Sequence, residues 1–146
     1  MDATRRNPRD DPDRTAQHVL VIDGGHFGLA VAEYLTEGAR SVTLVSETEP
    51  TGVADEVTLI QRTLSDANDV RALASEVTDI DINIVVIVGS DSKALLLGYL
   101  ARREFDPCDV VAGISNPANG SAFEGTGVDH IDLPQLLAEQ VCDRYE

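Results

Sequence analysis

The sequence has few basic residues, and this shortage excludes several classes of partner. Its 146 residues include 26 acidic and 11 basic side chains, and Lys93 is the only lysine. The formal net charge of −15 disfavours binding to nucleic acid or to an anionic membrane, because both are polyanions. Acidic surfaces of this kind are typical of proteins adapted to high salt, so we expect a halophilic source.

Long hydrophobic runs are also missing. The longest run, residues 84–88, has the length of a strand, whereas a membrane-spanning helix needs about 20 apolar residues. The charged, proline-containing N-terminus lacks the apolar segment of a signal peptide. We therefore expect a cytoplasmic protein that does not itself insert into a membrane.

Cysteine and histidine are too sparse and too widely spaced to indicate a metal site. Cys108 and Cys142 form no C-x-x-C pair, and we expect both to be free thiols. The three histidines, His18, His26 and His130, lack the spacing of metal ligands. The sequence therefore predicts no bound metal.

Apolar strands alternate with amphipathic helices along most of the chain. Strands are expected at residues 18–22, 41–46, 57–60, 83–88, 109–114 and 130–132, and helices at 27–35, 66–77, 93–105 and from 134 onward, with a helical turn at 121–124. This alternation, with short connections, predicts an α/β fold with a parallel sheet and right-handed crossovers. We expect a doubly wound, mostly parallel six-stranded, Rossmann-like single domain over residues 17–146, behind a disordered tail of residues 1–16.

Two of the predicted helices carry more detailed expectations. The first places Phe27, Val31, Tyr34 and Leu35 on one face, as an amphipathic helix packed on a sheet would. The next helix is expected to begin after Ser65, a residue type that favours the N-cap position.

A glycine-rich turn connects the first strand to the first helix. It consists of Asp23, Gly24, Gly25, His26, Phe27 and Gly28. A strand, a tight turn and a helix N-terminus form an anion site, because backbone N–H groups and the helix dipole converge there. In the pattern G-x-G-x-x-G, however, Asp23 stands where the first glycine belongs, and its carboxylate would repel a phosphate. The turn is therefore either a phosphate site or a purely structural connection.

Further candidate ligands follow other strands of the predicted sheet. About 20 residues after such a turn, NAD-binding proteins place an acid on the ribose hydroxyls. Ser46 occupies that place and Glu47 follows it, without an arginine after it to attract a 2′-phosphate. Gly89, Ser90 and Asp91 follow the strand at 83–88, where Ser90 and Asp91 are expected to cap a helix and Asp91 could also line the crevice.

The order of motifs over about residues 17–144 resembles the N-terminal domain of the RCK/KTN family (TrkA-N domains). Residues 90–102 are similar to the family's Asp-Asp-Glu-x-Asn-Leu helix start and its apolar continuation. Residues 110–117 resemble its fifth strand, which usually ends in Asp-Pro. Residues 127–134 resemble its Gly-Val-Asp step into the sixth strand and the final helix.

The resemblance implies a Rossmann-like regulatory module of a potassium channel or Trk/Ktr potassium transporter. Its implied ligand is NAD or NADH, with ATP, ADP, AMP and no ligand as the alternatives. The implied partners are a second copy of the chain and a membrane transporter or channel subunit, which would place the module at the inner face of the membrane. The family's Gly-Asp-Ala segment after strand three aligns with Arg62, Thr63 and Leu64, although Ser65, Asp66 and Ala67 are a rival alignment. The implied site residues are those of the glycine turn, with Ser46, Glu47, Thr63, Leu64, Gly89, Ser90 and Asp91.

Two other functions remain open. A degenerate lobe without nucleotide, acting as a dimerisation or scaffold unit, is favoured by the departures at Asp23, Ser46 and Arg62-Thr63. A small NAD(P)-dependent oxidoreductase is disfavoured, because no tyrosine is followed by lysine at the Tyr-x-x-x-Lys spacing. We predict no catalytic residue. The family's usual second lobe does not follow in this sequence, so we expect either a free-standing subunit or part of a longer chain.

Overall fold

The computed structural model describes residues 17–145 except 23–24, 39, 49–51 and 54. The predicted tail, residues 1–16, lies outside the described residues. In chain order the elements are β1 (His18–Ile22), α1 (His26–Glu37), β2 (Ser41–Ser46), β3 (Val57–Gln61), α2 (Ala67–Glu76), β4 (Ile82–Ile87), α3 (Asp91–Phe105), β5 (Asp109–Ile114), the 3-10 helix η4 (Pro117–Phe123), β6 (Asp129–Asp132) and α4 (Leu133–Tyr145).

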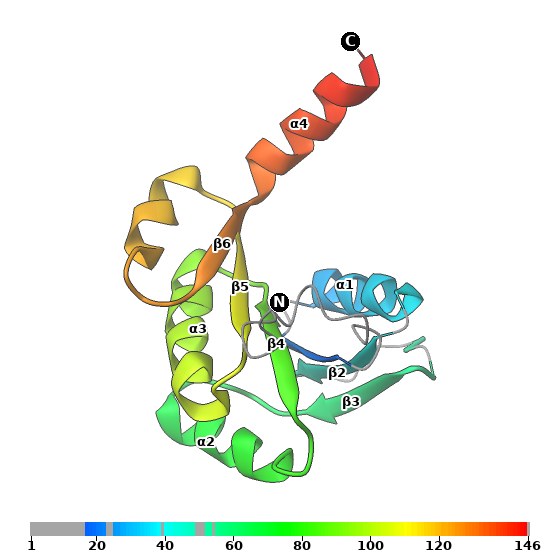
Figure 1. Ribbon diagram of the computed structural model, residues 1–146, viewed down its shortest axis with the longest axis vertical. Coiled ribbons are helices and arrows are strands. Elements are labelled where there is room, and N and C mark those ends of the chain that lie inside the picture. The colour runs from blue at the N-terminus through cyan, green and yellow to red at the C-terminus, as the bar shows by residue number, and fades with distance from the viewer. Residues whose placement is uncertain (1–16, 23–24, 39, 49–51, 54, 146) are drawn as a thin grey trace, which may run out of the picture.

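The six strands form one sheet in the order β3-β2-β1-β4-β5-β6, and every neighbouring pair is parallel (Figure 1). The predicted Rossmann-like sheet is therefore confirmed. All carboxyl ends of the strands lie at the same edge. The strand order reverses between β1 and β4, and open α/β sheets bind ligands in the crevice outside this reversal point.

Element bounds agree with the prediction to within a few residues, and one predicted cap is wrong. The N-cap of α2 is Asp66 rather than Ser65, because the Asp66 carboxylate accepts a hydrogen bond from the Asp69 N–H at 3.0 Å. The backbone N–H of Ser65 donates instead to the Asp69 carboxylate at 2.8 Å. The two bonds resemble a capping box, with an aspartate in the place where glutamate usually reaches back.

The face that α1 buries also differs from the predicted one. Its buried residues are Gly28, Leu29 and Ala32, whereas Phe27 is 50% exposed and Tyr34 is 72% exposed. The small residues Gly28 and Ala32 allow the helix to approach the sheet closely. The largest apolar side chains of α1 therefore do not lie on its packed face. The helix packs on the sheet through the side where its small residues let the helix backbone come nearest to the strands.

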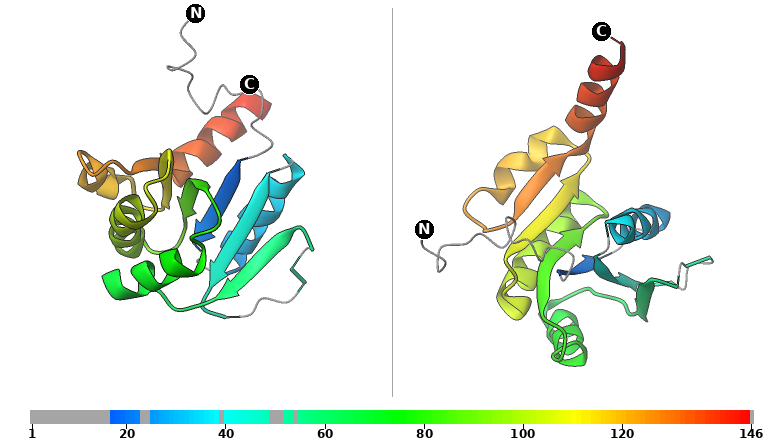
Figure 2. Two further views of the ribbon diagram at one scale, coloured as in Figure 1. Left: turned by 60° about the horizontal axis from the view of Figure 1, so that its bottom comes forward. Right: turned by 45° about the vertical axis from the view of Figure 1, so that its right-hand side comes forward.

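The sheet face that carries α2 and α3, called here the covered face, holds most of the core. Leu20, Val85, Ile87, Val110 and Ala112 point to this side and are at most 1% exposed. The helices lie along the strands on this side (Figures 1 and 2). This face is buried by the chain itself.

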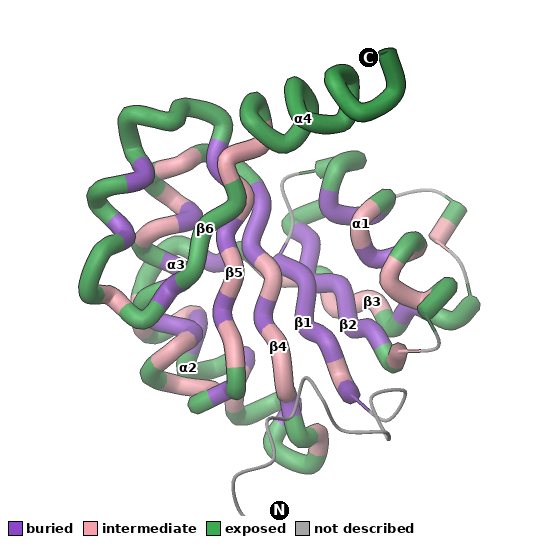
Figure 3. Tube along the Cα trace, turned by 45° about the horizontal axis from the view of Figure 1, so that its top comes forward, coloured by how far each residue is buried: buried purple, intermediate pink, exposed green. Residues whose placement is uncertain are grey.

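The opposite face is covered by α1 over β1, β2 and β3 only. Over β4, β5 and β6 it presents Ile84, Val86, Val111, Gly113 and Ile131, called here the open half-face, and none of these residues is fully buried (Figure 3). The difference arises because the helix and 3-10 helix of this half, α3 and η4, both lie on the covered side.

The last helix, α4, extends away from the sheet instead of packing on it (Figures 1 and 2). None of its residues is buried. Leu133, at its start, is in contact range of Gly113 on the open half-face. Beyond that point Leu136, Leu137 and Val141 are 44%, 67% and 49% exposed. Of the helices described, none is long and apolar enough to cross a membrane.

Candidate functional site

The glycine turn places an open backbone segment at the start of α1. Gly25 is the N-cap of α1 and has a φ of 87°, a conformation that favours glycine. A Cβ added there would meet nothing within 4 Å, so the space beside this backbone is free. The neighbouring His26 is exposed, and Gly28 is buried. Asp23 and Gly24 lie outside the described residues, so their predicted roles stay predictions.

At the end of β2, Glu47 rather than Ser46 faces solvent. Ser46 is only 2% exposed, and its carbonyl accepts the Arg62 N–H at 2.9 Å. Glu47 is exposed, and its backbone carbonyl accepts a hydrogen bond from the Gln61 amide at 3.4 Å. Its carboxylate Oε1 lies 3.1 Å from the Lys93 Nζ. A ligand at this corner would therefore meet Glu47 and Lys93 together.

Beside this pair lies a small recess with an apolar floor. The recess measures about 10 Å³ and is lined by Ile22, Val45, Glu47, Arg62, Leu64, Lys93 and Leu97. It adjoins a groove of about 440 Å³ lined by Leu64, Ser65, Ser92, Lys93, Leu96 and Leu97. Both hollows lie at the edge where the parallel strands end. Of the predicted residues after β3, Leu64 lines both hollows, whereas Thr63 is exposed and lines neither.

The Asp91 carboxylate forms hydrogen bonds within the protein, to the segment that follows β5. Ser90 caps α3 by accepting the Lys93 N–H at 3.3 Å, and Gly89 before it has a φ of 141°. The Asp91 carboxylate accepts the N–H groups of Ser115 and Asn116, each at 2.9 Å, and the Asn119 amide at 2.8 Å. These hydrogen bonds, first that of Ser115, lower the pKa of Asp91 from its ordinary value of 3.8. Asp91 therefore joins α3 to the end of β5 as an anion.

Arg62 and Lys93 are the basic groups at this corner. Arg62 forms an ion pair with Glu76 of α2. Lys93 was not predicted as a site residue, because nothing in the linear sequence links it to Glu47, 46 residues away. The available signal was its position in the first turn of a helix that follows a central strand, together with its being the sole lysine.

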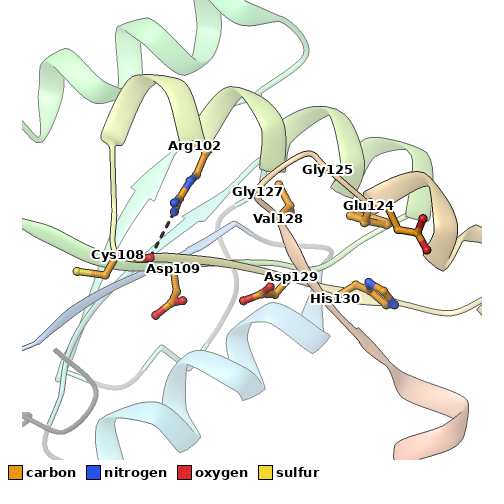
Figure 4. A pocket seen from close by; sticks show the side chains of 10 residues that line it. Arg102, Cys108, Asp109, Glu124, Gly125, Gly127, Val128, Asp129 and His130 are labelled. Atoms are coloured by element: carbon orange, nitrogen blue, oxygen red, sulfur yellow. Dashed lines mark hydrogen bonds between the residues drawn. The ribbon is translucent and has the colours of Figure 1, made fainter. Parts of the chain in front are cut away.

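A larger hollow lies at the opposite edge of the sheet and is unsuited to a nucleotide. It measures about 660 Å³ and lies where β5 and β6 begin, between Arg102, Glu124 and the two aspartates Asp109 and Asp129 (Figure 4). The Arg102 guanidinium donates to the carbonyls of Pro107 and Cys108, at 3.0 and 3.3 Å. The acids outnumber this one arginine, and a phosphate would be repelled.

Within the described part of the chain, no group of three or more His, Cys, Asp or Glu side chains could hold a metal ion. The predicted absence of a metal itself remains a prediction.

Comparison with known proteins identifies the family. The family model described as the TrkA-N domain matches residues 19–134. The chain belongs to the TrkA-N family. A relative named Trk system potassium uptake protein TrkA homolog, from Methanothermobacter thermautotrophicus, is 30% identical over 124 residues, which are 83% of this chain and 56% of the relative. The chain thus spans little more than half the length of this TrkA homolog.

Solved structures share the TrkA-N fold at low sequence identity. The TrkA-N domain of the Escherichia coli inner membrane protein ybaL has a TM-score of 0.67 and 12% identity, covering 90% of this chain and 98% of that one. The GsuK channel bound to NAD has a TM-score of 0.65 and 14% identity, covering 87% of this chain and 23% of the channel chain. A GsuK structure bound to ADP also matches, with a TM-score of 0.64 and 15% identity over 87% of this chain and 34% of that one.

Proposed function

We propose that this TrkA-N domain is a regulatory module of a potassium uptake system or channel and binds NAD(H) or an adenine nucleotide. The module acts by binding rather than by catalysis. One observation carries the proposal: the open backbone at Gly25, where α1 begins, and the Glu47 carboxylate occupy the same strand-end edge of a Rossmann-like sheet. That combination matches the needs of a pyrophosphate and a ribose.

The family supports a potassium-linked role. The relative from Methanothermobacter thermautotrophicus bears the name of a potassium uptake protein, and the GsuK structures contain NAD or ADP. In the proposed role the module lies on the cytoplasmic side of the membrane and contacts the transport protein there. Regulation requires that nucleotide bind two arrangements of the assembly with different affinity.

We further propose that the module works as a homodimer. The open half-face is apolar toward the strand-end edge, with Asp109 and Asp129 at its other end. Its apolar part lies next to the exposed apolar side of α4 at β6. Leu133, Leu136, Leu137 and Val141 follow an i, i+3, i+4, i+8 spacing, which places them on one side of α4. In a two-fold pair, α4 of each copy would cover the open half-face of its partner, so the same contact would form twice.

The alternative, a lobe that no longer binds nucleotide, rests on specific features of the same edge. Ser46 is buried, Asp91 is occupied by backbone contacts, and the recess beside Glu47 is small. Such a lobe would keep the proposed dimer surface but would gain no stability from any nucleotide.

The proposed function is tested by binding of NADH and ADP to the purified chain, measured by calorimetry and by thermal unfolding. A ligand at 100 times its Kd adds about 2.7 kcal/mol to the stability of the folded state. We expect Gly25→Asp to weaken binding at least about tenfold, because it puts a carboxylate where the pyrophosphate would lie.

A matched control separates this effect from backbone strain. Gly125 has a φ of 75° and, like Gly25, has nothing within 4 Å of an added Cβ, but it lies at the opposite edge of the sheet. Gly125→Asp adds the same charge at another glycine with a positive φ, and it is expected to bind as the parent does. Equal binding by the parent and Gly25→Asp would refute the placement of the site, and no binding by the parent would favour the degenerate lobe.

A further inference from the structure

Both kinds of side chain that select an adenine ribose meet at one corner of the strand-end edge. In dinucleotide-binding proteins an acid after β2 binds the ribose 2′-hydroxyl, whereas a basic group accommodates a 2′-phosphate. Here Glu47 follows β2, and Lys93 reaches it from α3, with Nζ 3.1 Å from Oε1. Arg62 lines the same recess. The acid that would exclude a 2′-phosphate is therefore paired with a cation.

The Glu47–Lys93 pair is held by its surroundings yet accessible to solvent. The Gln61 amide donates to the Glu47 carbonyl, and the Ser90 cap fixes the backbone of Lys93 in the first turn of α3. The two side chains are 53% and 42% exposed. A ligand could therefore bind Glu47 or Lys93 and break the ion pair with only a small loss of free energy, because exposed ion pairs are weak.

The local charge at this corner differs from that of the whole chain. Lys93 offsets Glu47, and Arg62 is paired with Glu76. The charges of these four described side chains therefore balance, although the protein carries a net charge of −15. A phosphate meets less repulsion here than at the acidic hollow beside Asp109 and Asp129.

We propose that Lys93 is a specificity-determining residue that lets the site accept a 2′-phosphorylated adenine ribose, as in NADP(H), as well as the unphosphorylated ribose of NAD(H). The inference rests on the proposed nucleotide site. With NADH, Glu47 accepts a hydrogen bond from the ribose hydroxyl while Lys93 holds the carboxylate. With NADPH, the Lys93 ammonium exchanges Glu47 for a phosphate oxygen, and Glu47 turns to solvent.

The test is calorimetric titration of NADH and NADPH into the parent chain and its variants at one potassium chloride concentration. We expect the parent to bind the two cofactors within about tenfold of each other. Lys93→Gln is expected to lose at least about tenfold in NADPH affinity and less than about threefold in NADH affinity, since it removes a charged donor from the phosphate alone. Glu47→Gln should do the reverse, weakening NADH and sparing NADPH.

Two controls make the result specific to position. Arg103→Gln removes one positive charge from the last turn of the same helix and should leave the NADPH-to-NADH ratio unchanged. Lys93→Arg keeps the charge and should retain NADPH binding. The ratio is a readout that a general loss of stability would not move, and thermal unfolding checks that each variant is folded.

The outcomes distinguish this inference from the function on which it rests. If the parent binds neither cofactor, the inference about Lys93 fails, and if it does not bind ADP either, the proposed function fails with it. If it binds NADH but Lys93→Gln leaves the NADPH-to-NADH ratio unchanged, the nucleotide site stands and the role of Lys93 is refuted. A parent that prefers NADH by more than about tenfold would also overturn the inference. One hydrogen bond to a charged group is worth about tenfold in affinity, so such a preference would mean that Lys93 does not make the site accept the 2′-phosphate.

Discussion

The two faces of the sheet differ in how they are covered. On the covered face, α2 and α3 bury Val85, Ile87 and Val110 to 1% exposure or less. On the other face α1 covers only half of the strands, so that Ile84, Val86 and Val111 keep part of their surface in contact with solvent (Figure 3).

The covered face is stabilised within one chain, whereas we assign the covering of the open half-face to a second copy. The close-packed core of the covered face, together with the smaller buried cluster under α1, fixes the sheet and the positions of its strand ends. The exposed apolar area of the open half-face and α4 is of the kind that marks interaction surfaces. In the proposed module, the covered face holds the nucleotide site in place and the open half-face joins the copies.

The largest expected effect comes from a matched pair of substitutions on β4. Ile87→Ala, on the covered face, should lower the free energy of unfolding by about 2–5 kcal/mol, because it leaves a cavity in a packed core. Ile84→Ala, on the open half-face of the same strand, should cost about 1 kcal/mol at low protein concentration, since part of its side chain already meets water. Urea unfolding measures both.

Equal costs for the two variants at low concentration would contradict the distinction between the faces. If the cost of Ile84→Ala rises with protein concentration while that of Ile87→Ala does not, the open half-face becomes buried on association.

The next largest effect concerns the proposed dimer. Leu137 is 67% exposed on α4, so Leu137→Asp should not change the stability of the monomer. In the dimer it would bury a carboxylate in an apolar contact, and we expect the dimer to weaken by about 2 kcal/mol, roughly thirtyfold. Sedimentation equilibrium measures this directly. Glu139→Gln, on the polar side of α4, is the control, and a parent that stays monomeric at high concentration would refute the dimer.

The smallest effect concerns the contact that joins α3 to the end of β5. Asp91→Asn should lower stability by about 1 kcal/mol at neutral pH, since it removes the charge that three donors share at a partly exposed site. The pKa of Asp91 is lowered by those hydrogen bonds, so its contribution is present above its ordinary pKa of 3.8 and is lost as the pH falls through the folded value. The parent and the variant should converge in acid.

Thermal unfolding between pH 7 and pH 3 tests this, with the exposed Asp79→Asn as a control. A difference between the parent and Asp91→Asn that does not shrink in acid would contradict an ionic contact.

Most of the fold could be predicted from the sequence because it depends on local patterns. The alternation of apolar strands with helices places β1, β2 and β5 at the predicted residues and fixes the parallel sheet. The packing of α1 and α4 could not be predicted in the same way. Both helices carry apolar side chains at helical spacing, but which side of a helix meets a sheet depends on the tertiary arrangement. Phe27 and Leu137 are exposed as a result.

The residues of the candidate site could be predicted only where their role depends on the sequence directly after a strand. Gly25 and Glu47 could be proposed from the strand–turn–helix pattern and from their spacing. The burial of Ser46 depends on the side to which the last residue of β2 points, and the approach of Lys93 to Glu47 depends on how α3 lies across the strand ends. The sequence places Asp91 correctly at a helix start. Its contacts with Ser115 and Asn116 could not be predicted, because those residues are 24 or more positions away in the sequence.

Nucleotide binding at the strand-end edge is the central claim, and amide chemical-shift mapping by NMR tests it most directly. On titration with NADH, we expect the largest shifts at the amides of Gly25, Gly28, Glu47, Leu64 and Lys93. The amides of Arg102 and Gly127, beside the larger hollow, should change little. No shifts, or shifts confined to that larger hollow, would contradict the account.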